Sequence, residues 1–299
     1  MQIINILSSP WAIILDRLLE IQAIYSTHLR GEKLDISAFI AQSGGPKSNP
    51  NEKRYDVTES GVAIVPMYGV MGKRMNLFTN ISGGVSTELV SKDIREILKD
   101  PDIKGILLDI DSPGGTVDGT QDLADVIFAG RDVKPIVAYT SGMIASAAYW
   151  VASAAHKTYI SSETCLVGSI GVVSTHIDYS EYEKKMGVKT TEIYAGKYKR
   201  IASQYKTLSK EGKKTIQDEV DYIYTVFVEN VAKHKGKTTE EVLTNMADGR
   251  TFIGKQAVDA GLVDGIDSMN HVLNMLPVMQ QQDDEAKRLK QFNNKLRGI

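Results

Sequence analysis

The chain has 299 residues, enough for one large domain or two modest ones with a sizeable hydrophobic core. Its 35 lysine and arginine residues nearly balance 37 aspartate and glutamate residues, so the net charge of -2 gives no electrostatic reason to expect nucleic-acid binding. The single cysteine, Cys165, excludes an internal disulfide framework and a zinc cluster, and the five histidines form no H-x-x-x-H pair. Neither a metal site nor a cofactor is expected.

The N-terminus is apolar but lacks the form of a signal peptide. No basic region precedes the apolar run, Pro10 and Trp11 interrupt it, and Asp16-Arg17 stand where a small-residue cleavage site would be. No segment of the sequence reaches the apolar length that is needed to span a bilayer. The sequence therefore favours an intracellular protein without a membrane anchor.

The residues before Tyr55 are expected to form an arm. Apolar residues at helical spacing predict an amphipathic helix from Ile13 to about Thr27. The run from Ser43 to Asn51 has the glycine, proline and serine content of a linker. We expect the arm to pack on the main domain or on a neighbour. The predicted organisation is an arm (1–54), a main domain (55–275) and a charged, helical tail (276–299).

The main domain alternates apolar strands with helices. Strands are predicted at Gly61–Gly69, Gly105–Ile110, Pro135–Tyr139, Lys157–Ile160 and Gly168–Val173, and helices at Thr87–Lys99, Thr116–Gly130, Ile144–Ala155 and from Ser209 to about His234. This order is typical of right-handed crossovers and a mostly parallel sheet. Such sheets carry their chemistry at the carboxyl ends of strands, where Ser112–Gly115 and Ser141-Gly142 fall.

Ser146 is the candidate nucleophile. It is predicted to lie in the first turn of an alanine-rich helix, where unpaired backbone N–H groups and the helix dipole stabilise an oxyanion. Small serines in such helices mostly permit close packing, so this stretch alone leaves both roles open. A catalytic role requires a base, an oxyanion site and a group that orients the base.

Candidates for the other roles are present. Pro113-Gly114-Gly115 follows a predicted buried strand and offers unobstructed backbone N–H groups for an oxyanion, although a plain strand-to-helix turn has the same sequence. As base, the sequence offers His176, 30 residues after Ser146, and Lys199, 53 residues after it. Histidine as a residue type needs little adjustment to act as a base near neutral pH, whereas a lysine must be desolvated. Both could instead be surface residues. Spacing alone does not choose between them.

Five motifs in order resemble the signal peptide peptidase A, or protease IV, family. The resemblance covers Gly61 to Asp264. The motifs are D-I-D-S-P-G-G (Asp109 to Gly115), S-G-M-I-A-S-A-A-Y (Ser141 to Tyr149), G-S-I-G-V (Gly168 to Val172), G-K-Y-K (Gly196 to Lys199) and A-D-G-R-T-F-I-G-K-Q-A-V-D-A-G-L-V (Ala247 to Val263). Any one of them is unspecific, whereas five in order at compatible spacing are a specific match.

The resemblance implies a serine endopeptidase with a Ser/Lys dyad. It implies that Ser146 is the nucleophile, Lys199 the general base, and Ser169 the hydroxyl that holds the lysine amine. Lys197, two positions before the matching lysine, is a neighbour. The related Clp protease fold uses a Ser-His-Asp triad, but His176 lies a few residues too late for that role.

The same resemblance implies an oxyanion hole, a fold and an assembly. Gly114 or Gly115, with the amide of Ala147, would bind the oxyanion. The implied fold is the α/β Clp-protease/crotonase-like fold, with a mostly parallel sheet and crossover helices. The implied assembly is a homo-oligomeric ring whose dyads form between neighbouring subunits or domains. The single copy of the protease unit would then need a partner subunit.

The start of the chain resembles the bacteriophage branch of this family, the head maturation proteases. Pro10-Trp11-Ala12-Ile13 followed by an amphipathic helix carries that resemblance. It implies polypeptide substrates, namely scaffold or capsid proteins, processed in the host cytoplasm inside the assembling prohead, with the chain's own tail as a further cleavage region. Three alternatives stay open: a cellular peptidase that degrades small peptides, a non-catalytic capsid-assembly subunit, and a crotonase-type acyl-CoA enzyme.

Overall fold

The computed structural model describes residues 10–29, 53–74 and 84–297. The predicted linker from Ser43 to Asn51 lies outside these residues. The strands are β1 (Trp11–Ile13), β2 (Asp56–Val57), β3 (Val62–Tyr68), β4 (Val70–Gly72), β5 (Gly84–Ser86), β6 (Gly105–Asp111), β7 (Gly114–Thr116), β8 (Ile136–Thr140), β9 (Met143–Ala145), β10 (Lys157–Ile160), β11 (Leu166–Gly168), β12 (Thr251–Ile253) and β13 (Gly265–Ile266). The helices are α2 (Leu15–Leu29), α5 (Thr87–Lys99), α6 (Thr120–Gly130), α7 (Ala147–Ser153), α8 (Ser180–Lys185), α9 (Lys210–Lys235), α10 (Thr239–Asn245), α11 (Lys255–Asp259) and α12 (Met269–Arg297).

A six-stranded sheet, in the order β13-β10-β8-β6-β3-β2, forms the centre of the described chain. All its neighbours pair in parallel except β2 and β3. Parallel neighbours require crossover connections, which the helices between the strands provide. The predicted α/β fold with a mostly parallel sheet and crossover helices is confirmed.

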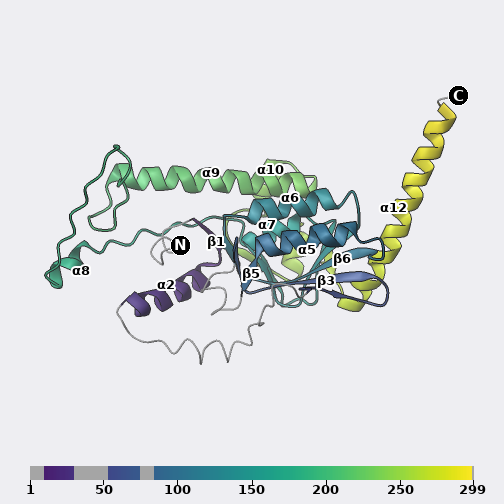
Figure 1. Ribbon diagram of the computed structural model, residues 1–299, viewed down its shortest axis with the longest axis horizontal. Coiled ribbons are helices and arrows are strands. Elements are labelled where there is room, and N and C mark those ends of the chain that lie inside the picture. The colour runs from purple at the N-terminus through teal and green to yellow at the C-terminus, as the bar shows by residue number, and fades with distance from the viewer. Residues whose placement is uncertain (1–9, 30–52, 75–83, 298–299) are drawn as a thin grey trace.

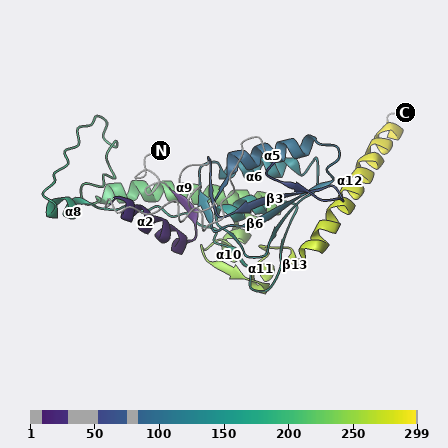
Figure 2. The same ribbon diagram turned by 60° about the horizontal axis from the view of Figure 1, so that its bottom comes forward.

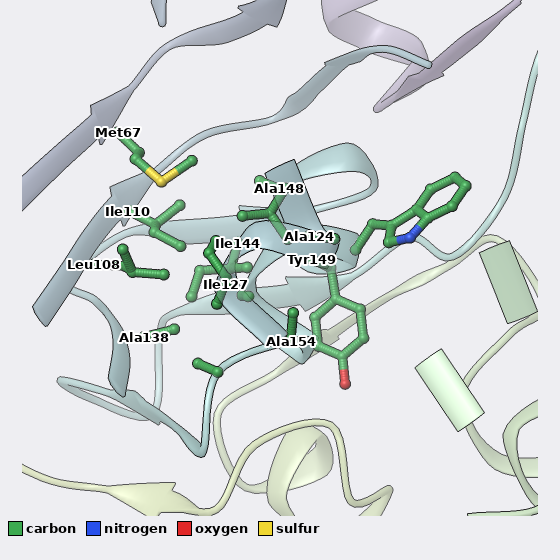
Figure 3. Packing of buried hydrophobic residues seen from close by; sticks show 14 of the residues in the cluster. Met67, Leu108, Ile110, Ala124, Ile127, Ala138, Ile144, Ala148, Tyr149 and Ala154 are labelled. Atoms are coloured by element: carbon green, nitrogen blue, oxygen red, sulfur yellow. The ribbon is translucent and has the colours of Figure 1, made fainter. Parts of the chain in front are cut away.

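Both faces of this sheet are covered, and the residues of β3, β6 and β8 alternate between two hydrophobic clusters. On β6, Ile106 and Leu108 belong to the main core with α5, α6 and α7, whereas Leu107 packs with the first turns of α12 at Val272 and Leu276. Figure 3 shows the main core, in which Ile127 of α6 and Tyr149 of α7 lie over the strands. The apolar run of β6 is therefore explained by burial on both faces.

Two long helices leave the body at opposite ends (Figures 1 and 2). The C-terminal half of α9 packs on α7, where the rings of Trp150 and Phe227 stack at a centroid distance of 4.5 Å. Its N-terminal half extends outward with the segment that carries α8 (Figure 1). At the other end, α12 continues past Pro277 as an exposed helix.

Two small sheets lie beside the central one and differ from the elements predicted there. Gly114–Thr116, predicted as a turn and the start of a helix, is strand β7 in the order β1-β7-β4-β5. Ile144 and Ala145, predicted as the start of a helix, belong with Met143 to strand β9 in the order β12-β11-β9. Of the strand predicted at Gly168–Val173, only Gly168 belongs to β11, and Val173 forms an isolated bridge. Pairing with distant strands overrides the local helix propensity at these positions.

Candidate active site

Ser146 sits at a strained strand-to-helix turn, between β9 and α7. Its backbone has φ 54° and ψ -117°, and among the described residues only Ser146 and Ser169 have a positive φ without being glycine. Such a conformation costs about 1–3 kcal/mol and persists only where the surroundings hold it, most often at functional sites. Here the Ser146 N–H donates to Gly168 O at 2.7 Å, and Trp150 N–H donates to Ser146 O at 2.9 Å.

The Ser146 side chain is fully buried and its hydroxyl faces a backbone carbonyl. Ser146 Oγ donates to Gly171 O at 3.4 Å, which is a long hydrogen bond. The next residue, Ala147, begins α7, so its N–H is one of those without a partner inside the helix. A hydroxyl beside such an amide can attack a carbonyl whose developing negative charge the amide stabilises.

The register of two parallel strands brings Ser169 next to Ser146. Ala145 of β9 pairs with Gly168 of β11, so the two serines follow the ends of neighbouring strands. Ser169 has φ 53° and an exposed fraction of 8%, and its N–H donates to Arg250 O at 2.8 Å. The segment that leads into β12 at Arg250 thus holds the turn that carries Ser169. This arrangement puts a second serine beside the turn that carries Ser146.

Gly114 is in direct contact with Ser146. Its φ is 103°, and a Cβ placed on it would lie 3.0 Å from both Ala145 O and the Ser146 Cβ, and would overlap Ala12 O. Only glycine permits this approach. The Gly114 N–H donates to Ser112 Oγ at 3.3 Å, and Gly115 lies opposite Ala12 in the β1–β7 ladder. Of the three residues predicted for the oxyanion hole, Gly114 therefore contacts Ser146, Gly115 follows it in β7, and Ala147 is the residue after Ser146.

Within one chain, Lys199 lies far from this site. It is exposed, in the segment between α8 and α9, where the neighbouring Lys197 forms a 3.0 Å ion pair with Glu211 in the first turn of α9. Glu211 precedes Phe227, where α9 packs on α7, by 16 residues, which corresponds to ~24 Å of helix. Figures 1 and 2 both place this segment at the outer end of α9, and Figure 1 shows α7 near the opposite end of that helix.

Lys197, the neighbour of Lys199, and His176, the other candidate base, have partners away from Ser146. Hydrogen bonds to Tyr198 and Glu211 raise the pKa of Lys197 above its ordinary value, which keeps its amine protonated. His176 Nε2 lies 3.1 Å from Ser203 O, so its ring is bound to the backbone rather than to Ser146.

The residues that the structure describes contain no group of three or more His, Cys, Asp or Glu side chains arranged to hold a metal ion. None of their helices is both long and apolar enough to cross a membrane.

The sequence did not predict the position of β1. Trp11, Ala12 and Ile13, expected at the start of an amphipathic helix or before it, form a buried strand against β7 instead. The apolar run is the only local signal, and it does not identify a pairing partner that is 101 to 105 residues away in the chain.

Several relatives are peptidases by name. The chain is 34% identical to "Capsid assembly protease C" of Escherichia phage lambda over 76% of this chain and 51% of that protein. It is 30% identical to "Head-tail preconnector protein GP5" of Enterobacteria phage P21, over 73% of this chain and 43% of the relative. It is 33% identical to the "Putative signal peptide peptidase SppA" of Enterococcus faecium, over 61% of this chain and 53% of that protein. The chain thus spans about half the length of these relatives.

The family model described as peptidase family S49 matches residues 129–283, slightly more than half of the chain. The match takes in Ser146, Ser169 and Lys199 and begins after Gly114. Together with the relatives named above, it confirms the resemblance to the signal peptide peptidase A family. The chain belongs to peptidase family S49.

Proposed function

We propose that the protein is a serine endopeptidase in which Ser146 attacks the carbonyl carbon of a peptide bond. The observation that carries the proposal is the turn at Ser146, which is buried, has a positive φ and lies against Gly114. Lys199 takes the hydroxyl proton and then donates a proton to the leaving amine, so that an acyl-enzyme forms on Ser146. Water then hydrolyses this ester, and the amides of Gly114 or Gly115 and Ala147 bind the oxyanion in both steps. Ser169 orients the lysine amine.

The dyad is shared between two subunits of a homo-oligomeric ring. The distance of Lys199 from Ser146 within one chain supports this arrangement. The segment that carries Lys199 also exposes apolar side chains that a monomer would leave in water. These are Met186, Val188, Ile193, Tyr194 and Tyr198, and Ile193 is 96% exposed. Burial of such a surface against a second copy brings Lys199 to the neighbour's Ser146.

Scaffold or capsid proteins are the substrates, processed during prohead maturation in the host cytoplasm. The support is the likeness to a phage protein named for capsid assembly and to another named for the head-tail preconnector. The chain's own tail is a further candidate for cleavage. The alternative is a cellular peptidase, like the relative named a signal peptide peptidase, which acts on small peptides.

The test compares Ser146→Ala with Ser153→Ala, which alters a buried serine at the other end of α7 whose hydroxyl bonds Trp150 O and His234. Each purified variant is incubated with the proteins encoded beside it and with a fluorophosphonate, and products and adducts are identified by mass spectrometry. We expect Ser146→Ala to fold normally but to lose cleavage and adduct, whereas Ser153→Ala keeps both. Continued cleavage by Ser146→Ala would falsify the assignment. Cleavage of small peptides but none of the capsid proteins would favour the cellular alternative.

A further inference from the structure

Strand β1 lies between two backbone segments that border Ser146. One edge of β1 pairs antiparallel with β7, so that Ala12 faces Gly115 and Ile13 faces Gly114. On its other edge, Trp11 and Val173 exchange two backbone hydrogen bonds of 2.8 Å each. The N-terminal arm therefore completes a small sheet across the candidate site.

The contact with the site is direct. Ala12 O and the Ser146 Cβ both lie close to Gly114, because a Cβ placed on this glycine would overlap Ala12 O and lie 3.0 Å from the Ser146 Cβ. Ile14 N–H donates to Pro113 O at 3.1 Å. Since hydrogen-bonded pairs alternate along an antiparallel ladder, Ala12 and Gly115 stand at a hydrogen-bonding position. Gly115 is one of the two glycines proposed to bind the oxyanion, so β1 faces a group that catalysis requires.

We infer that the slot held by Trp11–Ile13 is the binding site for an extended segment of a polypeptide substrate, and that β1 is an intramolecular occupant that must leave first. Without β1, β7 and Val173 present backbone donors and acceptors to any extended chain, as sheet edges do when they bind peptides. This inference rests on the proposed function, because the slot is productive only if Ser146 is the nucleophile.

The side chains of β1 define what the slot accepts. Ala12 is fully buried and belongs to the main core of the peptidase, so its position admits only a small side chain. Trp11 and Ile13 point to the opposite face, as alternate residues of a strand do, and pack in a separate cluster. The expected substrate segment therefore has a small residue between two large apolar ones.

The arm can leave while it keeps much of its own apolar packing. The cluster around Trp11 and Ile13 is completed by Leu18 and Ile21 of α2, and the body contributes to it only Val70 and the partly buried Val173 among the described residues. The hydrophobic contacts of the arm are thus largely with itself. Its departure removes one small side chain, that of Ala12, from the main core. Helix α2 would move together with β1 and keep Trp11 and Ile13 covered.

A reversible disulfide tests the inference in the full chain. Trp11 and Thr116 face each other at a non-hydrogen-bonded position of the ladder, where side chains are closest, so Trp11→Cys with Thr116→Cys can form a bridge that locks β1 in place. The native Cys165 is buried. We expect oxidation to lower the cleavage of fluorescein-labelled casein at least tenfold and dithiothreitol to restore it. The single variant Trp11→Cys serves as control and should not respond to oxidation.

A second experiment loosens the arm. Trp11→Ala with Ile13→Ala removes the contacts with α2, and we expect casein cleavage and fluorophosphonate labelling of Ser146 to become several-fold faster. The matched control is Leu15→Ala with Leu19→Ala, which alters apolar residues of α2 that are 57% and 52% exposed and should leave both rates unchanged. A peptide with the sequence of Pro10 to Leu15, P-W-A-I-I-L, should inhibit the loosened variant, and a scrambled peptide should not.

The outcomes separate the two proposals. Equal casein cleavage by the bridged and the reduced forms overturns the role of β1 and leaves the nucleophile intact, provided that Ser146 is labelled. If Ser146 stays unlabelled in every variant and redox state, the nucleophile assignment fails, and the substrate slot fails with it.

Discussion

Gly114 and Ser146 are in such close contact that a Cβ on the glycine would lie 3.0 Å from the Cβ of the serine. The two residues are 32 positions apart in the chain: Gly114 begins β7 of one small sheet, and Ser146 directly follows β9 of the other. Their contact joins the turn that presents the hydroxyl to the backbone that is proposed to receive the oxyanion. It also explains why a glycine stands at the start of β7.

Gly114→Ala is expected to abolish peptidase activity and to lower the free energy of unfolding by about 2 kcal/mol or more, because the new methyl group would overlap Ala12 O at a φ of 103°. Gly236→Ala, at the end of α9, is the control: its φ is 63°, but nothing lies within 4 Å of the added carbon. It should cost about 1 kcal/mol for the backbone alone and keep activity. Urea unfolding and casein cleavage measure the two effects. Equal effects of the two substitutions would contradict the close contact.

Mixed oligomers test whether the dyad is shared. Ser146→Ala and Lys199→Ala are each expected to be inactive, whereas a mixture that has exchanged subunits regains activity. At equal and random mixing, about a quarter of the interfaces pair an intact serine with an intact lysine. A mixture of Ser146→Ala with the double variant serves as the negative control. Lys197→Ala alone should stay active, because its amine is paired with Glu211. Exchange without any recovery would place the base in the same chain.

His234 makes the stability of the fold depend on pH. It is buried beside Ser153, with Nδ1 2.9 Å from the serine Oγ, and burial, with Lys233 and Arg131 nearby, lowers its pKa to about 4. The unfolded chain binds this proton near pH 6.5, so the folded state loses stability as the pH falls from about 6.5 to about 4, by up to ~3 kcal/mol. At higher pH this contribution is fully present.

His234→Asn is expected to flatten this part of the profile, measured as the free energy of unfolding in urea between pH 7 and pH 4. His156, whose pKa is also lowered, mainly by burial, adds a slope of the same sign in both proteins. The comparison between them therefore isolates His234. An unchanged slope in the variant would show that His234 is not the responsible group.

The local sequence was sufficient for the layered part of the fold. The apolar run of β6 and the helical spacing in α5 and α9 predicted these elements close to their observed bounds. Ser146 was also predicted close to a strand-to-helix junction, but Ile144 and Ala145 of β9 were assigned to the helix. Its residues extend because β9 pairs with β11, and no local pattern identifies that partner.

By itself, the sequence determined the order of strands and helices, the family motifs and the chemical groups available at Ser146, Ser169 and Lys199, because periodicity and motif spacing are local properties of the chain. Only the tertiary structure decided which of these groups meet. Strand pairing and packing bring Ser169 and Gly114 next to Ser146. The segment before α9 holds Lys199 away from Ser146, and β1 lies across the site. These relationships depend on backbone pairing and packing between distant segments, whose partners the local sequence does not specify.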